Sequence, residues 1–278
     1  MEFHAITLPL VNSGDDYIGI ILDAIKEKGL TIEDKDVIVI ASKVPSTALG
    51  LIVKLEDCKP SQRAVDMARE FNLDPSYAAI IQTILDESED FYGGLAYQKE
   101  KFMVLWTKKN RSLSINAGVD RKNSPLGTVA LELREPHKVA DNARLDVLKK
   151  TGKHVGISII DSAWYPLRQG AIGFTIGLSG FEATRDCTKD ADGKQSVDIY
   201  GRPVPIARHC VADDVAAGAH LMLGEAGERV GAVLARGLPV DFNDKADPSS
   251  MYMSENEDPF MRVFQAARKV VERPQWRD

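Results

Sequence analysis

The chain has 278 residues, of which 44% are hydrophobic and 27% charged, and no window approaches the ~18 consecutive apolar residues of a membrane span. This length can bury one large core or two modest ones, and the composition is typical of a soluble globular protein. The formal net charge of −6 argues against a general nucleic-acid binder, but it does not exclude a phosphorylated ligand held by backbone amides and metal ions.

The three cysteines Cys58, Cys187 and Cys210 are widely spaced and form no C-x-x-C pair. Their odd number and their spacing indicate neither a disulfide framework nor a zinc knuckle, and they fit a reducing compartment. The N-terminal residues lack a basic segment followed by a long apolar run, so no signal peptide is expected. We therefore expect a cytoplasmic protein.

In chain order, a short apolar segment at residues 5–11 is followed by an amphipathic helix that ends at Gly29, where a C-terminal cap belongs. The β-branched run 37–41 lacks alternation and predicts a strand buried on both faces. The polar pair Ser42 and Lys43 follows it directly. Ligand contacts are common at such a position, although a chain that merely leaves the core would look the same.

Two helices are predicted next, one over residues 61–71 and one that opens at Asp74 and Pro75, an N-cap followed by proline at the first helical position. Residues 102–106 and 113–117 are predicted to be adjacent strands joined by a polar turn.

A further helix begins near Pro136 and ends at Gly152, and a buried strand from Val155 then delivers Asp161 and Ser162 at its carboxyl end. The apolar segment that follows is interrupted by four glycines. Their spacing is not G-x-G-x-x-G and no helix pattern opens there, so we reject a dinucleotide-binding fingerprint and attribute these glycines to close strand packing. They are Gly170, Gly173, Gly177 and Gly180.

Residues 184–200 form a polar loop, expected to be flexible, and a helix over 212–222 and a strand over 230–235 come after it. The segment 241–278 is predicted to be a C-terminal tail that ends in a helix. Because strands and helices alternate without a regular βαβ period, the predicted fold class is α+β, with mixed sheets and packed helices. We interpret residues 1–278 as one catalytic unit, with two lobes as the alternative.

The central stretch of the sequence runs from Ser114 to Asn123. Gly118 permits backbone angles that a β-carbon forbids, so Asp120 can be placed abruptly at the end of a strand. Asp120 and Asn123 suit a hard cation or a polar ligand. A solvated turn is the competing interpretation, since Asp and Asn are ordinary turn residues.

Three acids, Asp120, Asp161 and Glu225, each follow an apolar element and adjoin glycine or small polar residues. Carboxylates gathered into one pocket repel one another unless a cation lies between them. Mg²⁺ or Mn²⁺ would satisfy them together with a hydroxyl such as that of Ser162, and two such ions can clamp the phosphates of a nucleotide. Three unrelated surface acids remain possible in a chain with 41 Asp and Glu. The sequence contains no P-loop, kinase H-R-D, G-x-S-x-G or H-E-x-x-H motif.

Taken together, these segments resemble the coenzyme F420-0:gamma-glutamyl ligases over nearly the whole chain. The resemblance is carried by the ordered recurrence of short pieces rather than by any one of them. The pieces are residues 8–11, 14–16, 37–43, Ser46, Gly50, 116–123, 151–156, 160–162, 173–180, 200–202, 210–213, 222–225, 236–238, Tyr252, Ser254, Glu255, Glu257 and Asp258.

The resemblance implies a GTP-dependent ligase that joins L-glutamate to the lactyl carboxylate of F420-0 through an acyl phosphate and works as an intertwined homodimer. It implies two divalent ions, Mg²⁺ or Mn²⁺, with K⁺ as a further candidate. The implied catalytic and metal-binding residues are Asp120, Asp161, Ser162 and Glu225. The implied GTP-contacting residues are Leu8, Pro9, Leu10, Val11, Ser42, Lys43, Asn123, Leu223, Gly224, Ala226, Gly227, Glu228, Arg229 and Val230.

Several positions depart from the family pattern. Thr47 stands where a nucleotide-contacting lysine is usual, and Ala207 replaces a common threonine. Trp164 and Tyr165 replace a glycine-arginine pair beside the metal ligands and could reshape the acceptor pocket. Two alternatives therefore stay open: an amide ligase with a different carboxylate acceptor, and a nucleotide-binding protein without ligase turnover.

Overall fold

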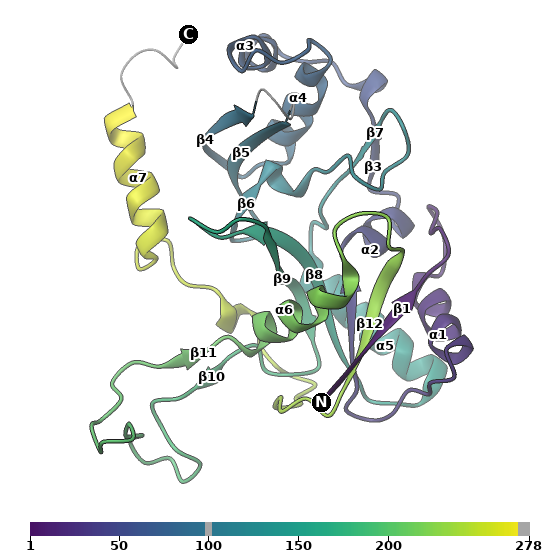
Figure 1. The fold of residues 1–278 in the computed structure, drawn as a ribbon, viewed down its shortest axis with the longest axis vertical. Coiled ribbons are helices and arrows are strands. Elements are labelled where there is room, and N and C mark those ends of the chain that lie inside the picture. The colour runs from purple at the N-terminus through teal and green to yellow at the C-terminus, as the bar shows by residue number, and fades with distance from the viewer. Residues whose placement is uncertain (98–101, 272–278) are drawn as a thin grey trace. The chain divides into compact units, whose positions relative to one another are not determined.

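The computed structural model describes residues 1–97 and 102–271, with side chains described as far as residue 266. The chain divides into two compact units. Unit 1 comprises Met1–Gly50 and Leu133–Met251, and unit 2 comprises Leu51–Glu132 together with the chain from Tyr252 onward. Both units combine helices with mixed or antiparallel sheets, which confirms the predicted α+β class (Figure 1). The end of the predicted tail, residues 272–278, lies outside the described residues.

A five-stranded sheet forms the centre of unit 1. Its order is β1 (Glu2–Thr7), β12 (Val230–Arg236), β2 (Val37–Ala41), β8 (Gly156–Trp164) and β9 (Ala171–Ser179). Only β2 and β8 pair in parallel; the other neighbours are antiparallel. The carboxyl ends of β1, β2 and β8 and the start of β12 therefore share one end of the sheet, which we name the carboxyl rim. The opposite end is the amino rim.

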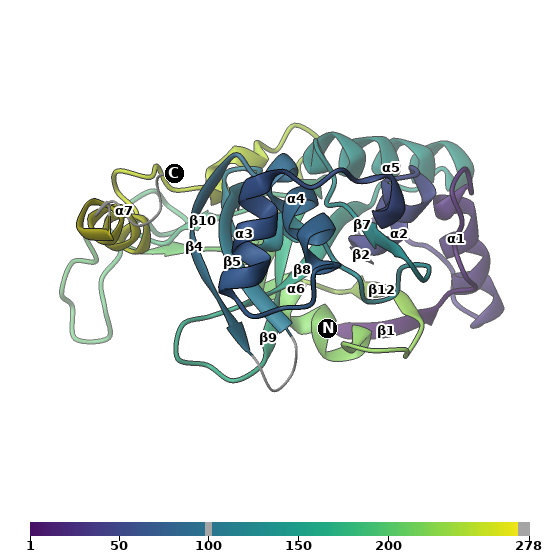
Figure 2. The same cartoon turned by 90° about the horizontal axis from the view of Figure 1, so that it is seen from above.

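Helices cover both faces of this sheet. Helix α6 (Val211–Leu223) packs on one face and α5 (Pro136–Thr151) on the other, as Figure 2 shows from above. Two glycines of β9 make this packing possible: a β-carbon on Gly173 would lie 2.8 Å from the Ala216 carbonyl oxygen of α6, and one on Gly177 would lie 2.5 Å from the Pro136 carbonyl oxygen of α5. Close backbone packing thus accounts for these two glycines, and the partners are helices as well as strands.

Two further helices of unit 1 are α1 (Tyr17–Glu27) and the short α2 (Lys43–Ala48). A short 3-10 helix, Pro248–Met251, closes this part of the chain. The strands β10 (Arg185–Asp186) and β11 (Arg208–His209) form a two-stranded pair. Between them, residues 187–207 extend away from the sheet of unit 1, and we call this segment the arm (Figure 1).

Unit 2 contains the antiparallel sheet β4 (Asp90–Tyr97), β5 (Phe102–Lys109) and β6 (Ser112–Ile115), and the pair β3 (Ile52–Lys54) and β7 (Thr128–Ala130). Its helices are α3 (Gln62–Glu70), α4 (Tyr77–Glu87) and α7 (Pro259–Val271), with 3-10 turns at Leu55–Asp57 and Asn116–Gly118. Helix α7 packs its Phe264 ring 6.0 Å from those of Tyr92 and Trp106, so the C-terminal segment belongs to this core.

The predicted helices and strands named above are present, and β5 and β6 pair as expected. Several features differ. Strand β8 continues past Asp161 to Trp164 because β9 pairs with it throughout, and the second predicted strand ends at Ile115 in a left-handed turn. Helix α2 and strands β3, β4 and β7 were not predicted. None of the helices in the described part of the chain combines the length and apolar character that crossing a bilayer requires.

Candidate nucleotide and metal site

Four of the predicted ligand-contacting segments meet at the carboxyl rim of unit 1. The Ser42 amide donates to the Ile160 carbonyl oxygen at 2.9 Å, which places the end of β2 beside Asp161. The Leu8 amide donates to the Arg229 carbonyl oxygen at 2.9 Å, which joins residues 8–11 to the loop before β12. Since β12 lies between β1 and β2, and β2 adjoins β8, the four segments follow one another along the rim. Their span is about three strand spacings, roughly 14 Å.

The first pair of predicted ligands, Asp161 and Ser162, point to opposite faces of the sheet because side chains alternate along a strand. Ser162 pairs with Gly173, the glycine under α6, so its hydroxyl lies on the α6 face. Asp161 pairs with Phe174 and lies on the other face, where its Oδ1 accepts from the Ser162 amide at 2.8 Å. The rim therefore presents a hydroxyl on one side of β8 and a carboxylate on the other.

Glu225 lies beyond the end of α6, in the loop that leads to β12, and its Oε1 is 2.9 Å from Nε2 of His220. The His220 β-carbon lies 2.8 Å from where a β-carbon on Gly173 would stand. A chain of contacts thus runs from Ser162 through Gly173 and His220 to Glu225. No sequence pattern singles out His220: the five histidines of the chain are scattered, and its contact with Glu225 spans five residues across a helix end.

The loop after α6 gathers backbone amides around a carboxylate. Gly224 has φ +75°, and the Ala226 amide donates to Glu228 Oε2 at 2.7 Å. Hydrogen bonds from the amides of Glu228 itself, of Ala226 and of Glu225 hold the pKa of the Glu228 carboxyl below its usual range. A concentration of N–H groups that stabilises an anion in this way is a feature of phosphate-binding loops. In the structure these amides donate to Glu228, so a phosphate would bind them only in place of that carboxylate.

In unit 2, three consecutive residues of the central stretch have left-handed backbone angles: Asn116 (φ 55°), Ala117 (φ 51°) and Gly118 (φ 68°). Side-chain hydrogen bonds hold this turn. Asn116 Oδ1 accepts from the Leu105 amide at 2.8 Å, and Thr107 Oγ1 accepts from the Ala117 amide at 2.8 Å. Such angles are strained for residues other than glycine and persist only where surrounding contacts enforce them. The predicted freedom of Gly118 is confirmed, and Thr107 is a supporting residue that sequence reasoning missed.

Asp120 follows this turn, and its backbone pairs with Ala130. Asp120 Oδ1 accepts from the Lys122 amide at 2.8 Å, an Asx turn, and Asn123 has φ 58°. The turn character considered for this stretch is therefore present, and a carboxylate in an Asx turn keeps further acceptor positions. Asp120 and Asn123 belong to unit 2, whereas the other predicted site residues belong to unit 1.

The predicted metal ligands offer oxygen atoms only, from carboxylates and one hydroxyl, and this donor set suits Mg²⁺ or Mn²⁺ rather than zinc or copper. Within residues 1–97 and 102–271, no group of three or more His, Cys, Asp or Glu side chains is clustered closely enough to hold a metal ion. Mg²⁺ typically takes only one or two carboxylates and completes its shell with water and substrate phosphates. A site completed by nucleotide fits these residues.

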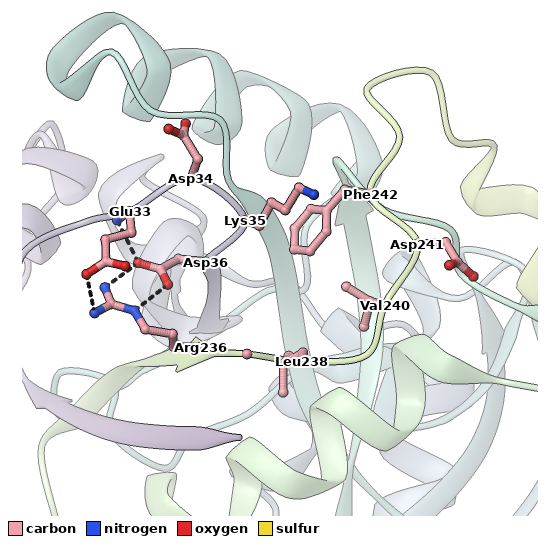
Figure 3. A pocket seen from close by; sticks show the side chains of 10 residues that line it. Glu33, Asp34, Lys35, Asp36, Arg236, Leu238, Val240, Asp241 and Phe242 are labelled. Carbon is pink, nitrogen blue, oxygen red and sulfur yellow. Dashed lines mark hydrogen bonds and ion pairs between the residues drawn. The ribbon is translucent and has the colours of Figure 1, made fainter.

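A pocket of about 570 Å³ lies at the opposite, amino rim of unit 1. Three charged residues that line this pocket form ion pairs with one another: Arg236 donates to both oxygens of Asp36, at 2.8 and 2.7 Å, and to Glu33 at 2.7 Å (Figure 3). Asp36 is only 1% exposed. These bonds tie the end of β12 to the loop before β2, so we assign this cluster to stability rather than to ligand binding.

Comparison with known proteins gives one consistent result. The family model described as F420-0:Gamma-glutamyl ligase matches residues 5–237. The chain is 35% identical over 257 residues to the coenzyme F420:L-glutamate ligase of Archaeoglobus fulgidus, covering 92% of this chain and 94% of that protein. It is also 35% identical over 232 residues to the protein of the same name from Methanothermobacter thermautotrophicus, covering 84% and 86%.

Proposed function

The chain belongs to the F420-0:gamma-glutamyl ligase family, and we propose that it is a GTP- and divalent-metal-dependent ligase that joins L-glutamate to the carboxylate of coenzyme F420-0. The observation that carries the nucleotide part of this proposal is the meeting of four ligand-type segments at the carboxyl rim. The acceptor and the amino acid come from the names of the family and of its members.

The reaction follows from the poor reactivity of a carboxylate as an acyl donor. A carboxylate oxygen of F420-0 attacks the γ-phosphorus of GTP, the bond to the β–γ bridging oxygen breaks, and GDP leaves. The glutamate amine then attacks the carbonyl carbon of the acyl phosphate, the carbon–oxygen bond to phosphate breaks, and the amine loses a proton as the amide forms. Positioning of the reactants and neutralisation of charge on the phosphates supply the catalysis.

Each part of the rim has a role in this scheme. Residues 8–11 and 223–230 contact the nucleotide, and the loop amides that now donate to Glu228 would bind its phosphates in place of that carboxylate. Lys43 supplies a positive charge beside them, while Thr47 supplies none. Asn123, from unit 2, is assigned to the nucleotide as well.

Asp120 and Asp161 would hold the first divalent ion and Glu225 the second, and the hydroxyl of Ser162, which lies on the α6 face of β8 with Glu225, would supply a further oxygen ligand. When bound, the ions neutralise charge on the triphosphate and orient it for in-line transfer. This assignment is supported by the oxygen-only donor set.

A second candidate is an amide ligase of the same mechanism with another carboxylate acceptor. It is favoured by Trp164 and Tyr165, which are 39% and 47% exposed and follow Ser162 after one residue, Ala163. Two exposed aromatic side chains at this position offer stacking surface that the usual glycine-arginine pair of the family would not.

We further propose that the protein is a homodimer in the cytoplasm. What supports association is the arm, where three apolar side chains are almost fully open to solvent: Ile199 (92%), Ile206 (89%) and Tyr200 (79%). Side chains of this kind exposed together mark interaction surfaces. The three cysteines are free thiols, as a reducing compartment requires.

The dimer is tested by sedimentation equilibrium. The double variant Ile199→Glu, Ile206→Glu should be monomeric, whereas Leu126→Glu, which places one such charge on a fully exposed leucine of unit 2, should leave the dimer intact. A dimeric arm variant, or a monomeric wild-type protein, contradicts this part of the proposal.

Function is tested by incubating the protein with GTP, Mn²⁺, F420-0 and glutamate and measuring the glutamyl mass increment. Product should form with GTP but not with ATP, and Asp161→Ala should abolish it because the first ion loses a ligand. If one carboxylate oxygen of F420-0 is labelled with ¹⁸O, the acyl-phosphate route requires label in the released phosphate. Exchange of K⁺ for Na⁺ in the same assay tests a K⁺ requirement.

Phosphate release only with a different carboxylic acid would favour the second candidate. Nucleotide binding without turnover on any acid would overturn the ligase proposal, and full activity of Asp161→Ala would overturn the metal assignment.

A further inference from the structure

His220 contacts the proposed second-metal ligand and has no role in the function described above. Its Nε2 lies 2.9 Å from Glu225 Oε1, and the exposed fractions of the two side chains are 16% and 45%. Nε2 is the donor, because an ionised carboxylate offers acceptors only. A mostly buried donor therefore holds one oxygen of a half-exposed carboxylate.

The helix that carries His220 is fixed to the sheet along its length. At its start, the Thr175 amide of β9 donates to Asp213 Oδ1 at 3.0 Å, and Thr175 Oγ1 donates to the Ala212 carbonyl oxygen at 2.8 Å. Further along, Ala216 and Ala219 are fully buried against the sheet. At its last turn, the missing β-carbon of Gly173 makes room for His220 itself.

Glu225, in contrast, lies outside the helix. Gly224 ends α6 with φ +75°, and Glu225 begins the loop that leads to β12 (Figure 1). A glutamate side chain in such a loop can adopt several rotamers. A cation that binds it must select one of them, and the conformational entropy lost in this selection weakens binding. The hydrogen bond from His220 restricts this freedom in advance. A carboxylate has about four lone-pair positions, and the bond from His220 uses one of them.

We infer that His220 is a positioning residue: its Nε2–H orients the Glu225 carboxylate as a divalent-cation ligand on the α6 side of the carboxyl rim. This inference rests on the proposed function for the role of Glu225. Removal of a residue that is hydrogen-bonded to a metal ligand commonly lowers metal affinity about 10–100-fold. His220 therefore sets the affinity of the second ion without touching it.

The experiment measures Mn²⁺ binding in the presence of GDP and without acceptor, by the electron paramagnetic resonance signal of free Mn²⁺. His220→Phe keeps the ring volume and removes the donor, so it should weaken the Glu225-dependent Mn²⁺ site about 10–100-fold. His220→Gln places an amide N–H near the position of Nε2 and should restore affinity to within about threefold of wild type. If His220→Phe does not fold, His220→Asn, whose amide is too short to reach, replaces it.

A double-mutant comparison separates positioning from general damage. Glu225→Gln should weaken the same site, and adding His220→Phe to it should cause no further loss, since the two residues act through one contact. The inference is overturned if His220→Phe binds Mn²⁺ like wild type, if His220→Gln is as weak as His220→Phe, or if the two losses add. This assay contains no acceptor and measures Mn²⁺ binding alone. Failure of the ligation reaction would therefore leave its result unchanged, and the positioning role of His220 is tested separately from ligase activity.

Discussion

The left-handed turn that precedes Asp120 gives the sharpest stability prediction, for the variant Asn116→Ala. The Asn116 side chain accepts from the Leu105 amide at 2.8 Å and donates to the Met103 carbonyl oxygen at 3.3 Å, and both partners are buried. A buried backbone amide left without an acceptor costs about 1–3 kcal/mol. Alanine also tolerates φ 55° less well than asparagine, which adds roughly 1 kcal/mol. The expected loss in the free energy of unfolding is therefore about 2–4 kcal/mol.

Asn123→Ala is the matched control, because Asn123 has nearly the same backbone angle (φ 58°) but is exposed. It should lose the same backbone component, about 1 kcal/mol, and the contacts of its exposed side chain should add less than a buried amide left without an acceptor. Urea unfolding gives both free energies, and amide exchange of residue 105 reports the lost bond directly. The reasoning is refuted if the two variants lose equal stability, or if the Leu105 amide stays as protected in Asn116→Ala as in wild type.

Three further predictions concern unit 1. Arg236→Ala should lower the free energy of unfolding in urea by about 3–5 kcal/mol, since it leaves Asp36 buried without its partner, and a loss below 1 kcal/mol would contradict the structural assignment. Gly177→Ala should cost about 1–3 kcal/mol in the same assay, because its β-carbon would overlap the Pro136 carbonyl oxygen and β9 or α5 must move. Burial, with a neighbouring aspartate, raises the pKa of Cys210 to about 12, so only roughly one thiol in 10⁴ is ionised at pH 8. Iodoacetamide should therefore label Cys210 slowly at pH 8, and the labelling rate should rise with pH. Rapid labelling of the folded protein at pH 8 would disprove this prediction.

Elements whose structure is decided by a local residue pattern could be predicted from the sequence. The unbroken β-branched run of β2 produces a strand buried on both faces, and Pro136 and Gly152 mark the two ends of α5. Strand β4 lacked such a pattern: it contains Gly93 and Gly94, which lower strand propensity, and its pairing with β5 stabilises it. Local preference was overruled there by tertiary contacts.

In the candidate site too, some features follow from local sequence and others depend on tertiary contacts. Asp161 and Ser162 could be recognised at the end of an apolar run, but their opposite directions depend on β8 continuing to Trp164, which the pairing with β9 determines. The meeting of residues 8–11 with the loop before β12 depends on β12 inserting between β1 and β2, and no local signal in the sequence encodes that order. Only the resemblance to a family connected these segments beforehand.

The account depends most on nucleotide binding at the carboxyl rim of unit 1, and amide hydrogen exchange with and without GTP and Mn²⁺ tests this directly. Protection should increase at residues 8–11, 42–43 and 223–230 and stay unchanged at residues 33–36 and 236–242, which line the pocket at the amino rim. Protection at the amino rim with none at the carboxyl rim would contradict the account.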